Sequence, residues 1–267
     1  MHKVLINSLP KSGTNLLAQI LDLYNFKENE HLGSGLFLSP RLIPRIRNLI
    51  YKDIKDGYEI GIDTPVKIRK KYIEKILRNC KVGGYVTSHL GYNDLLIDYI
   101  KDQKFKIIFM VRDPRAVLNS SYNYILNNHN HKLNAHLKKM SVKKRYESLI
   151  YGEKVNNFTL NSIKQKYDII NKFKYDPSVL TIKFENIIGS KGGGSDELKM
   201  LNIQNIANFI KADLSKTKFV SENFFGPGRK TFRRGNIESW RDEMPFEVVM
   251  EATNEFKSIL SSWDYPI

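Results

Sequence analysis

Short apolar segments alternate with longer segments of helical periodicity along most of the chain, and no other feature constrains the fold as strongly. Four apolar runs predict buried strands at residues 3–8, 84–87, 105–111 and 179–184. Apolar residues that recur every three or four positions predict helices from Thr14 and over residues 68–80, 93–100, 114–126, 141–173, 197–210 and 246–260. This order predicts an α/β fold with a central, mainly parallel β-sheet flanked by helices.

Three segments lack such periodicity and are expected to be irregular. Residues 30–60 are rich in Gly, Pro and Arg and indicate a long connection or lid. Residues 189–195 indicate a flexible loop, and residues 221–236 are irregular and basic. We expect one domain over residues 1–267, with ligands binding beyond the carboxyl ends of the strands.

The first predicted strand leads into a helix through the sequence Pro10-Lys11-Ser12-Gly13-Thr14-Asn15. Backbone N–H groups of Ser12, Gly13, Thr14 and Asn15 are expected to point into this loop, where the helix dipole also favours an anion. The Lys11 side chain is long enough to reach the charged oxygens of an anion bound in this loop. The spacing is not G-x-x-x-x-G-K-[ST], the pattern of nucleotide-hydrolysing proteins. A plain strand–helix turn remains the alternative.

Charge and cysteine content limit the possible partners. The sequence holds 43 Lys and Arg against 28 Asp and Glu, a net charge of +15. Such a charge is typical of proteins with an anionic partner, such as a nucleic acid, a membrane surface or a phosphorylated small molecule. A basic surface that is merely solvated is an equal alternative until motifs are considered. The single Cys80 excludes an intrachain disulfide. With neither a signal peptide nor a run of about 18 apolar residues, the expectation is a cytoplasmic protein.

Two later segments complete a pattern with the Pro10–Thr14 loop. The first is Arg112-Asp113-Pro114, followed by Ser120 and Tyr122 at the spacing R-[ND]-P-x-x-x-x-x-S-x-Y. The second is Arg233-Arg234-Gly235, followed by Trp240-Arg241. In order and spacing, the three segments resemble the signatures of sulfotransferases that use 3′-phosphoadenosine 5′-phosphosulfate (PAPS). The third departs from the family pattern, because Glu238-Ser239 replaces Gly-Asp and Arg234 replaces Lys.

The resemblance implies a fold of the P-loop nucleotide-kinase type and a binding site for PAPS and its product, adenosine 3′,5′-bisphosphate (PAP). The residues implied at the phosphosulfate are Lys11, Ser12, Gly13, Thr14 and Asn15. Those implied at the 3′-phosphate are Arg112, Ser120, Arg233, Arg234 and Gly235. The positions implied near adenine are Leu16, where other members have Trp, and Phe184, Thr217 and Phe219, all of which could equally be ordinary core residues.

The resemblance also implies the residues of the reaction. His89, in Thr87-Ser88-His89-Leu90, matches the [ST]-His-Leu context of the family's base. A neutral histidine suits a base near pH 7. Lys11 is implied to stabilise charge on the departing bisphosphate, and Ser120 to hold Lys11 back when no acceptor is bound. Thr87 stands where the family often has Lys. No metal is implied.

The expected function is transfer of a sulfuryl group from PAPS to a hydroxyl, or less favourably an amine, of a small-molecule acceptor, with natural products among the candidates. Two alternatives stay open: a P-loop nucleotide kinase or NTPase, which requires Mg²⁺ and ATP, and a basic nucleic-acid-binding protein, for which no motif is found. We expect neither a nucleic-acid nor a membrane partner. The family's dimer motif is interrupted at Met244-Pro245-Phe246, so the oligomeric state stays open.

Overall fold

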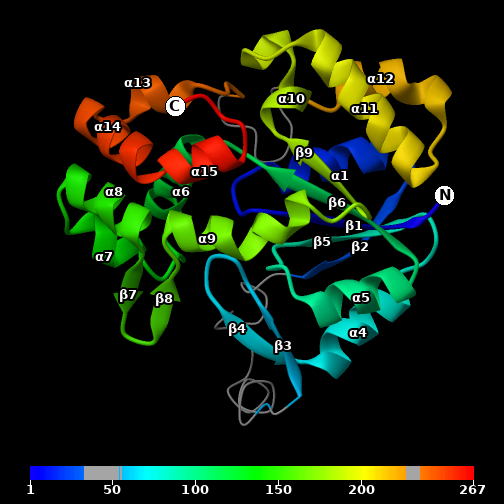
Figure 1. The fold of residues 1–267 in the computed structure, drawn as a ribbon, viewed down its shortest axis with the longest axis horizontal. Coiled ribbons are helices and arrows are strands. Elements are labelled where there is room, and N and C mark those ends of the chain that lie inside the picture. The colour runs from blue at the N-terminus through cyan, green and yellow to red at the C-terminus, as the bar shows by residue number, and fades with distance from the viewer. Residues whose placement is uncertain (33–53, 55, 227–234) are drawn as a thin grey trace.

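A computed structural model describes residues 1–32, 54, 56–226 and 235–267, which form a layered α/β structure (Figure 1). The strands are β1 (Lys3–Ser8), β2 (Lys27–Leu32), β3 (Gly57–Ile60), β4 (Val66–Arg69), β5 (Gly84–Ser88), β6 (Phe105–Val111), β7 (Glu153–Val155), β8 (Phe158–Leu160) and β9 (Val179–Lys183). The longer helices are α1 (Thr14–Leu23), α4 (Lys70–Asn79), α5 (Asp94–Asp102), α6 (Pro114–Asn127), α8 (Val142–Tyr151), α9 (Ile163–Ile170), α11 (Asp196–Ile210) and α14 (Phe246–Glu255). The shorter helical segments are α7 (Asn134–Lys138), η1 (Asn171–Lys174), α10 (Glu185–Ile188), η2 (Ser190–Gly192), η3 (Leu214–Lys216), α12 (Thr217–Asn223), α13 (Ser239–Glu243) and α15 (Lys257–Ser262).

The central sheet has five strands in the order β2-β5-β1-β6-β9. Every pair of neighbours in it is parallel, and Asn7 of β1 lies between Ser88 of β5 and Phe109 of β6. The predicted α/β fold with a parallel sheet between helices is therefore confirmed. Both faces of β1 and β6 are buried, which agrees with the apolar runs at residues 4–6 and 107–111.

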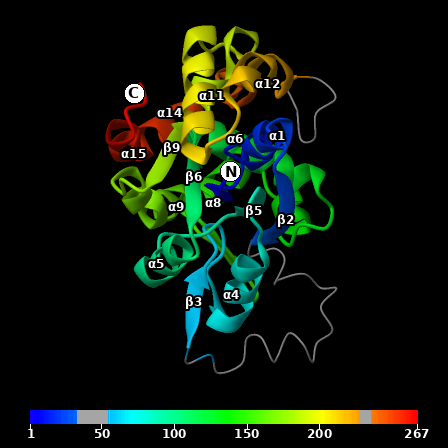
Figure 2. The ribbon, with the colours of Figure 1, turned by 90° about the vertical axis from the view of Figure 1, so that its right-hand side faces the viewer.

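Side chains of β1 alternate between two apolar layers. Val4 and Ile6 pack on one face, in a core cluster that includes residues of α1, α11 and α12. Leu5 and Leu9 belong to the cluster on the other face, which includes residues of α4, α5, α6 and α9. The two views show these helix layers on opposite sides of the strands (Figures 1 and 2).

Several predicted boundaries are wrong. Both ends of the irregular segment expected at 30–60 are strands: residues 30–32 belong to the edge strand β2, and residues 57–60 form β3. At an edge, the sequence Lys-Glu-Asn-Glu-His-Leu of β2 can face solvent and needs no apolar alternation. Ile68 lies in the β3–β4 hairpin, not in the following helix. Another hairpin, β7–β8, interrupts residues 141–173, and a break at Phe256 divides the last predicted helix.

Most of the expected lid at 30–60, residues 33–53 and 55, lies outside the described residues, as do residues 227–234. No helix in the described parts of the chain combines the length and apolarity needed to span a membrane.

Candidate functional site

Three neighbouring parallel strands, β5, β1 and β6, end at the same edge of the sheet, and each is followed by a segment singled out in the sequence. The loop Leu9–Gly13 follows β1, His89 follows β5, and Arg112 follows β6. The sheet therefore brings together residues that lie up to about a hundred positions apart. Loop, histidine and arginine form the candidate site.

The loop after β1 is a tight turn held by its own backbone. The Ser12 N–H donates to the Leu9 carbonyl at 3.1 Å, and Leu9 N–H donates to Met110 of β6 at 3.3 Å. Lys11 and Gly13 both have positive φ, 71° and 110°. Of the four N–H groups expected to point into the loop, that of Ser12 is thus used within the turn. Gly13 is the N-cap of α1, so the positive end of the helix dipole faces the loop.

Gly13 is required by close contacts as well as by its φ angle. A Cβ atom at this position would lie 2.8 Å from Met110 Sδ and 2.9 Å from Phe184 Cδ2. Phe184 is buried against the loop, and its ring also lies under the Arg112 guanidinium at 4.1 Å from the ring centroid. Phe184 therefore contacts two of the predicted anion-binding segments at once.

Two polar atoms at this site are buried and lack a hydrogen-bond partner among the described residues: Ser12 Oγ and Arg112 Nε. A buried unpaired donor costs about 1–3 kcal/mol, and the penalty is larger for a charged group. Oxygens of a phosphate or sulfate accept hydrogen bonds from both kinds of donor. The residues present thus fit an anion bound between the loop and the end of β6.

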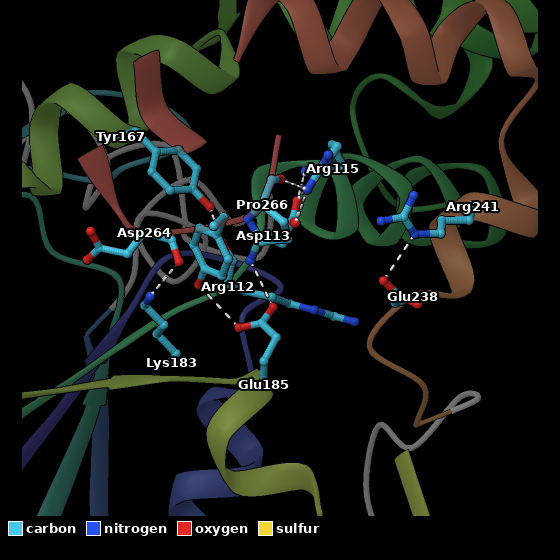
Figure 3. Close-up of polar contacts among 11 residues, drawn as sticks. Arg112, Asp113, Arg115, Tyr167, Lys183, Glu185, Glu238, Arg241, Asp264 and Pro266 are labelled. Atoms are coloured by element: carbon cyan, nitrogen blue, oxygen red, sulfur yellow. Dashed lines mark hydrogen bonds and ion pairs between the residues drawn. The ribbon is translucent and has the colours of Figure 1, made fainter. Parts of the chain in front are cut away.

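The backbone at Arg112 is fixed on both sides, as Figure 3 shows. Tyr167 donates from its hydroxyl to the Arg112 carbonyl, and the Asp113 N–H donates to Glu185 Oε1 at 2.9 Å. Tyr265 donates to the other oxygen of Glu185 at 3.2 Å. Burial raises the pKa of Glu185, and its bond from the Asp113 N–H and the nearby Arg112 oppose that shift. These groups hold the strand end while the Arg112 side chain extends away from them (Figure 3).

The C-terminal segment packs behind this strand end. Arg115 forms a two-point ion pair with Asp113, at 3.0 and 2.7 Å, and donates to the Pro266 carbonyl at 2.7 Å. Its guanidinium also stacks on Trp240, and Lys183 donates to the Asp264 carbonyl at 3.0 Å. The motif thus places Arg115, which anchors the C-terminal segment, close to Arg112, whose role in binding stays a prediction.

His89 is held in one tautomer. Its Nδ1 lies 2.9 Å from the Ser8 carbonyl oxygen, which can only accept, so Nδ1 carries the proton and Nε2 keeps a lone pair. The Ser8 hydroxyl lies 2.5 Å from that of Thr14, which links the histidine to the loop. Burial lowers the pKa of His89, and the neighbouring His31 lowers it further, against the opposing Ser8 hydrogen bond. The ring is therefore neutral at pH 7, with Nε2 able to accept a proton.

Two buried residues that the sequence analysis missed fix the backbone around His89. Asn7 donates from Nδ2 to the Leu90 carbonyl at 2.9 Å and accepts from the Leu90 N–H at 2.8 Å. Ser88 donates to the same side-chain oxygen at 2.9 Å. The signal in the sequence was a polar residue, Asn7, directly after the apolar run Val4-Leu5-Ile6.

Lys11 extends toward α6, the helix that begins just after Arg112. Its ammonium lies 3.9 Å from the centroid of the Tyr124 ring. Tyr124 and Ser120 are four residues apart and share a face of α6. The structure therefore brings Lys11 to the helix face that carries Ser120. These are the two residues that were predicted to interact.

The remaining predicted residues lie in different settings. Asn15 and Leu16 are in the first turn of α1. Thr217 is buried and donates to the Leu214 carbonyl at 2.7 Å, and Phe219 is 55% exposed. Their contact with adenine stays a prediction. Gly235 has φ 67°, whereas Arg233 and Arg234 lie outside the described residues.

Glu238 and Ser239, which depart from the family pattern, lie at the start of α13, where Glu238 is the N-cap and Ser239 is the first residue of the helix. Glu238 N–H donates to the Asn236 side chain at 2.8 Å, and its carboxylate pairs with Arg241 at 3.0 Å. Among the described residues, no group of three or more His, Cys, Asp or Glu side chains is placed to hold a metal ion.

Comparison with known proteins now identifies the family. Residues 1–264 match the family described as "Sulfotransferase domain". The structure of mouse sulfotransferase SULT7A1 complexed with PAP aligns with a TM-score of 0.61 at 16% identity, covering 97% of this chain and 85% of that one. Retinol dehydratase in complex with androsterone and inactive cofactor PAP aligns with a TM-score of 0.57 at 15% identity, covering 99% and 82%. Comparison with curated protein sequences gives no significant match.

The family match covers nearly the whole chain, and the solved structures share its fold. The chain belongs to the sulfotransferase family. Its activity is that of a PAPS-dependent sulfotransferase, which decides against the nucleotide-kinase and nucleic-acid-binding alternatives.

Proposed function

We propose that the site described above binds PAPS between the loop after β1 and the end of β6, and transfers its sulfuryl group to a hydroxyl of a small molecule. The observation that carries the proposal is the pair of buried donors without a partner among the described residues, Ser12 Oγ in the loop and Arg112 Nε at the end of β6. When bound, PAPS supplies the sulfuryl group on a phosphate leaving group. Residues of this chain bind the donor, stabilise the charge on the leaving group and take up the proton of the acceptor.

In this proposal Lys11, Ser12, Gly13, Thr14 and Asn15 hold the phosphosulfate, and Arg112 and Ser120 hold the 3′-phosphate, with Arg233, Arg234 and Gly235 closing over it. The turn at Gly13 lets backbone approach the anion closely, since no side chain intervenes. Lys11 offsets negative charge as the bisphosphate leaves, a role worth about 3–4 kcal/mol of barrier in comparable sites. Leu16, Phe184, Thr217 and Phe219 are the proposed surroundings of adenine.

His89 takes the proton of the acceptor hydroxyl at Nε2. Its Nδ1–H stays on the Ser8 carbonyl, so the ring keeps its orientation while it gains the proton. The hydrogen-bonded link from His89 through Ser8 to Thr14 ties the position of the base to the loop. A base that is fixed in one tautomer beside the loop after β1 can take the proton of an alcohol as its oxygen attacks the sulfuryl group in line.

The proposal also concerns the chemical class of the acceptor. Retinol dehydratase structures contain androsterone or retinol together with PAP, so this fold accommodates small molecules beside the bisphosphate. By analogy we propose a small-molecule alcohol, natural products included, rather than an amine or a macromolecule. We place the protein in the cytoplasm, because its single cysteine, Cys80, is buried and can form no intrachain disulfide. No metal is required by these steps.

Calorimetric titration with PAP tests the donor site, with ATP and Mg²⁺ as the control ligand. We expect PAP to bind without metal, and Arg112→Ala to weaken it by at least tenfold, because a charged donor to phosphate is lost. Arg78→Ala is the matched control, since Arg78 is an exposed residue of α4 that pairs with Glu74 and belongs to none of the three signatures. Absence of PAP binding, or preference for ATP with Mg²⁺, would overturn the proposal.

A further inference from the structure

A second histidine lies against His89, although it comes from a strand that the sequence pattern did not reveal. His31 of the edge strand β2 pairs in register with Thr87 of β5, two residues before His89. The His31 and His89 rings meet edge to face, with centroids 5.6 Å apart and planes at 76°. The His89 N–H also donates to the Leu32 carbonyl at 3.1 Å. Strand β2 thus positions both the ring and the backbone of the proposed base.

A chain of hydrogen bonds fixes the His31 ring. Thr87 donates from Oγ1 to Glu28 Oε1 at 3.1 Å, since a carboxylate can only accept. Having spent its proton there, Thr87 accepts from His31 Nδ1 at 2.8 Å. His31 therefore carries its proton on Nδ1, like His89. The order is Glu28, Thr87, His31, His89, and Thr87 occupies the position at which the family resemblance leads one to expect a lysine.

Two imidazoles at this separation cannot both be charged without mutual repulsion. The other charged groups that act on His89 are Lys11 of the loop, which disfavours its protonation, and Asp63 between β3 and β4, which favours it. Asp63 is paired with the buried Lys166 of α9 at 2.8 Å. On the other side, burial lowers the pKa of His31 and Glu28 opposes this. His31 is exposed and His89 is half-buried, so water solvates a charge on His31 better than one on His89, and we expect His31 to gain a proton first as the pH falls.

We propose that His31 is a positioning residue for His89: Glu28 and Thr87 hold its ring against the His89 imidazole, where it restricts uptake of solvent protons by the base. The inference rests on the proposed role of His89. In the reaction itself the proton still passes from the acceptor hydroxyl to His89 Nε2. His31 acts before that step, because it keeps the lone pair of Nε2 available at a pH where an isolated imidazole would begin to be protonated.

The test is an NMR titration of the full chain, following the Cε1–H signals of its six histidines. His89→Ala and His31→Phe assign the two signals. In His31→Phe, the ring contact is kept but no charge can form. We expect the midpoint of His89 to rise by at least about 0.5 pH units, the effect of one charge at this distance in water. His129→Phe, on an exposed residue after α6, is the matched control and should leave His89 unchanged.

Variants of Glu28 and Thr87 test the hydrogen-bond chain. Glu28→Gln removes an exposed carboxylate, and we expect the midpoint of His31 to fall. Thr87→Val should lower it too, whereas Thr87→Ser should restore it, because only serine keeps the hydroxyl. If His31→Phe does not fold, His31→Gln carries the same test, since an amide can donate to Thr87 and cannot gain charge. An unchanged His89 midpoint in the folded variant would overturn the proposal.

Turnover separates this inference from the proposed function. In His31→Phe, kcat/KM should fall about threefold on the acid limb of the pH profile for each half-unit shift, and stay near wild type on the alkaline plateau. A purely structural loss would lower both regions equally, and would contradict a positioning role. If His89→Ala keeps full activity, the proposed base is wrong even when the NMR midpoints show that the two rings are coupled.

Discussion

At the residue scale, Gly13 occupies a position that combines a positive φ with near contact to two side chains. For Gly13→Ala we expect a loss of about 1–3 kcal/mol in the free energy of unfolding and at least tenfold weaker PAP binding, because the loop must move away from Met110 and Phe184. Gly193→Ala separates the two causes. Gly193 also has positive φ, but a Cβ there would meet nothing nearer than 3.5 Å. Thermal melts and calorimetry measure both, and equal PAP affinity in the two variants would contradict the steric argument.

The protonation state of His89 also depends on the immediate surroundings of a single residue. Because burial holds the pKa of His89 below 6.5, the base is neutral and active above that pKa, and activity is lost as the pH falls through it. We expect His89→Ala to lower kcat by about 10²-fold or more while PAP affinity changes little. Steady-state rates between pH 5 and 8, paired with PAP titrations, provide the measurement. His129→Ala is the control, and a parallel loss of PAP binding in His89→Ala would point to a structural role instead.

At the scale of elements, Asp176 joins parts of the fold that are distant in sequence. Its carboxylate accepts from Lys101 of α5 at 2.9 Å, from Tyr92 at 2.8 Å and from Ser178 just before β9. Burial by itself would raise the pKa of Asp176, but these hydrogen bonds outweigh it and hold the pKa well below its usual range. The ion pair thus ties α5 to the start of the edge strand β9.

The sign of the resulting pH dependence follows from that lowered pKa. The stabilisation is complete above the unfolded pKa, about 3.9, and is lost as the pH falls through the lower folded value. We expect Asp176→Asn to cost about 2 kcal/mol at pH 7, and the difference from wild type to shrink below pH 4. Denaturant unfolding at several pH values measures this, with the exposed Asp102→Asn as control. A constant difference at every pH would show that packing, not charge, is lost.

At the scale of the whole molecule, the two apolar layers share one sheet. Both tryptophans, Trp240 and Trp263, belong to the layer that contains Leu5, whereas Ile6 faces the other layer. If residues 1–267 unfold as one unit, Ile6→Ala should lower the melting temperature seen by tryptophan fluorescence as much as that seen by far-ultraviolet circular dichroism. The expected loss is about 3 kcal/mol, or roughly 5 °C for a chain of this length. Separate transitions would contradict the expectation of a single domain.

The sequence by itself determined the parts of the protein that have a local cause. Strands β1 and β6 were predicted at their observed bounds because each contains a short apolar run, residues 4–6 and 107–111, of the kind found in strands buried on both faces of a parallel sheet. Pro114 fixed the start of α6, since its φ angle and missing N–H suit the first turn of a helix. The sulfotransferase family was also identifiable, because three short motifs are read from residue identity and spacing alone.

Only the tertiary structure decided which distant residues meet. Strand β2 carries no apolar alternation, because edge position lets its polar side chains face solvent, so neither the strand nor the contact of His31 with His89 was predictable. The same holds for Asn7 beside Leu90 and for Tyr265 on Glu185, contacts that join positions 83 and 80 residues apart. Their partners are set by the strand order and by how the chain end packs. Periodicity and motif spacing describe neighbours along the chain, whereas the environment of the base depends on neighbours across the sheet.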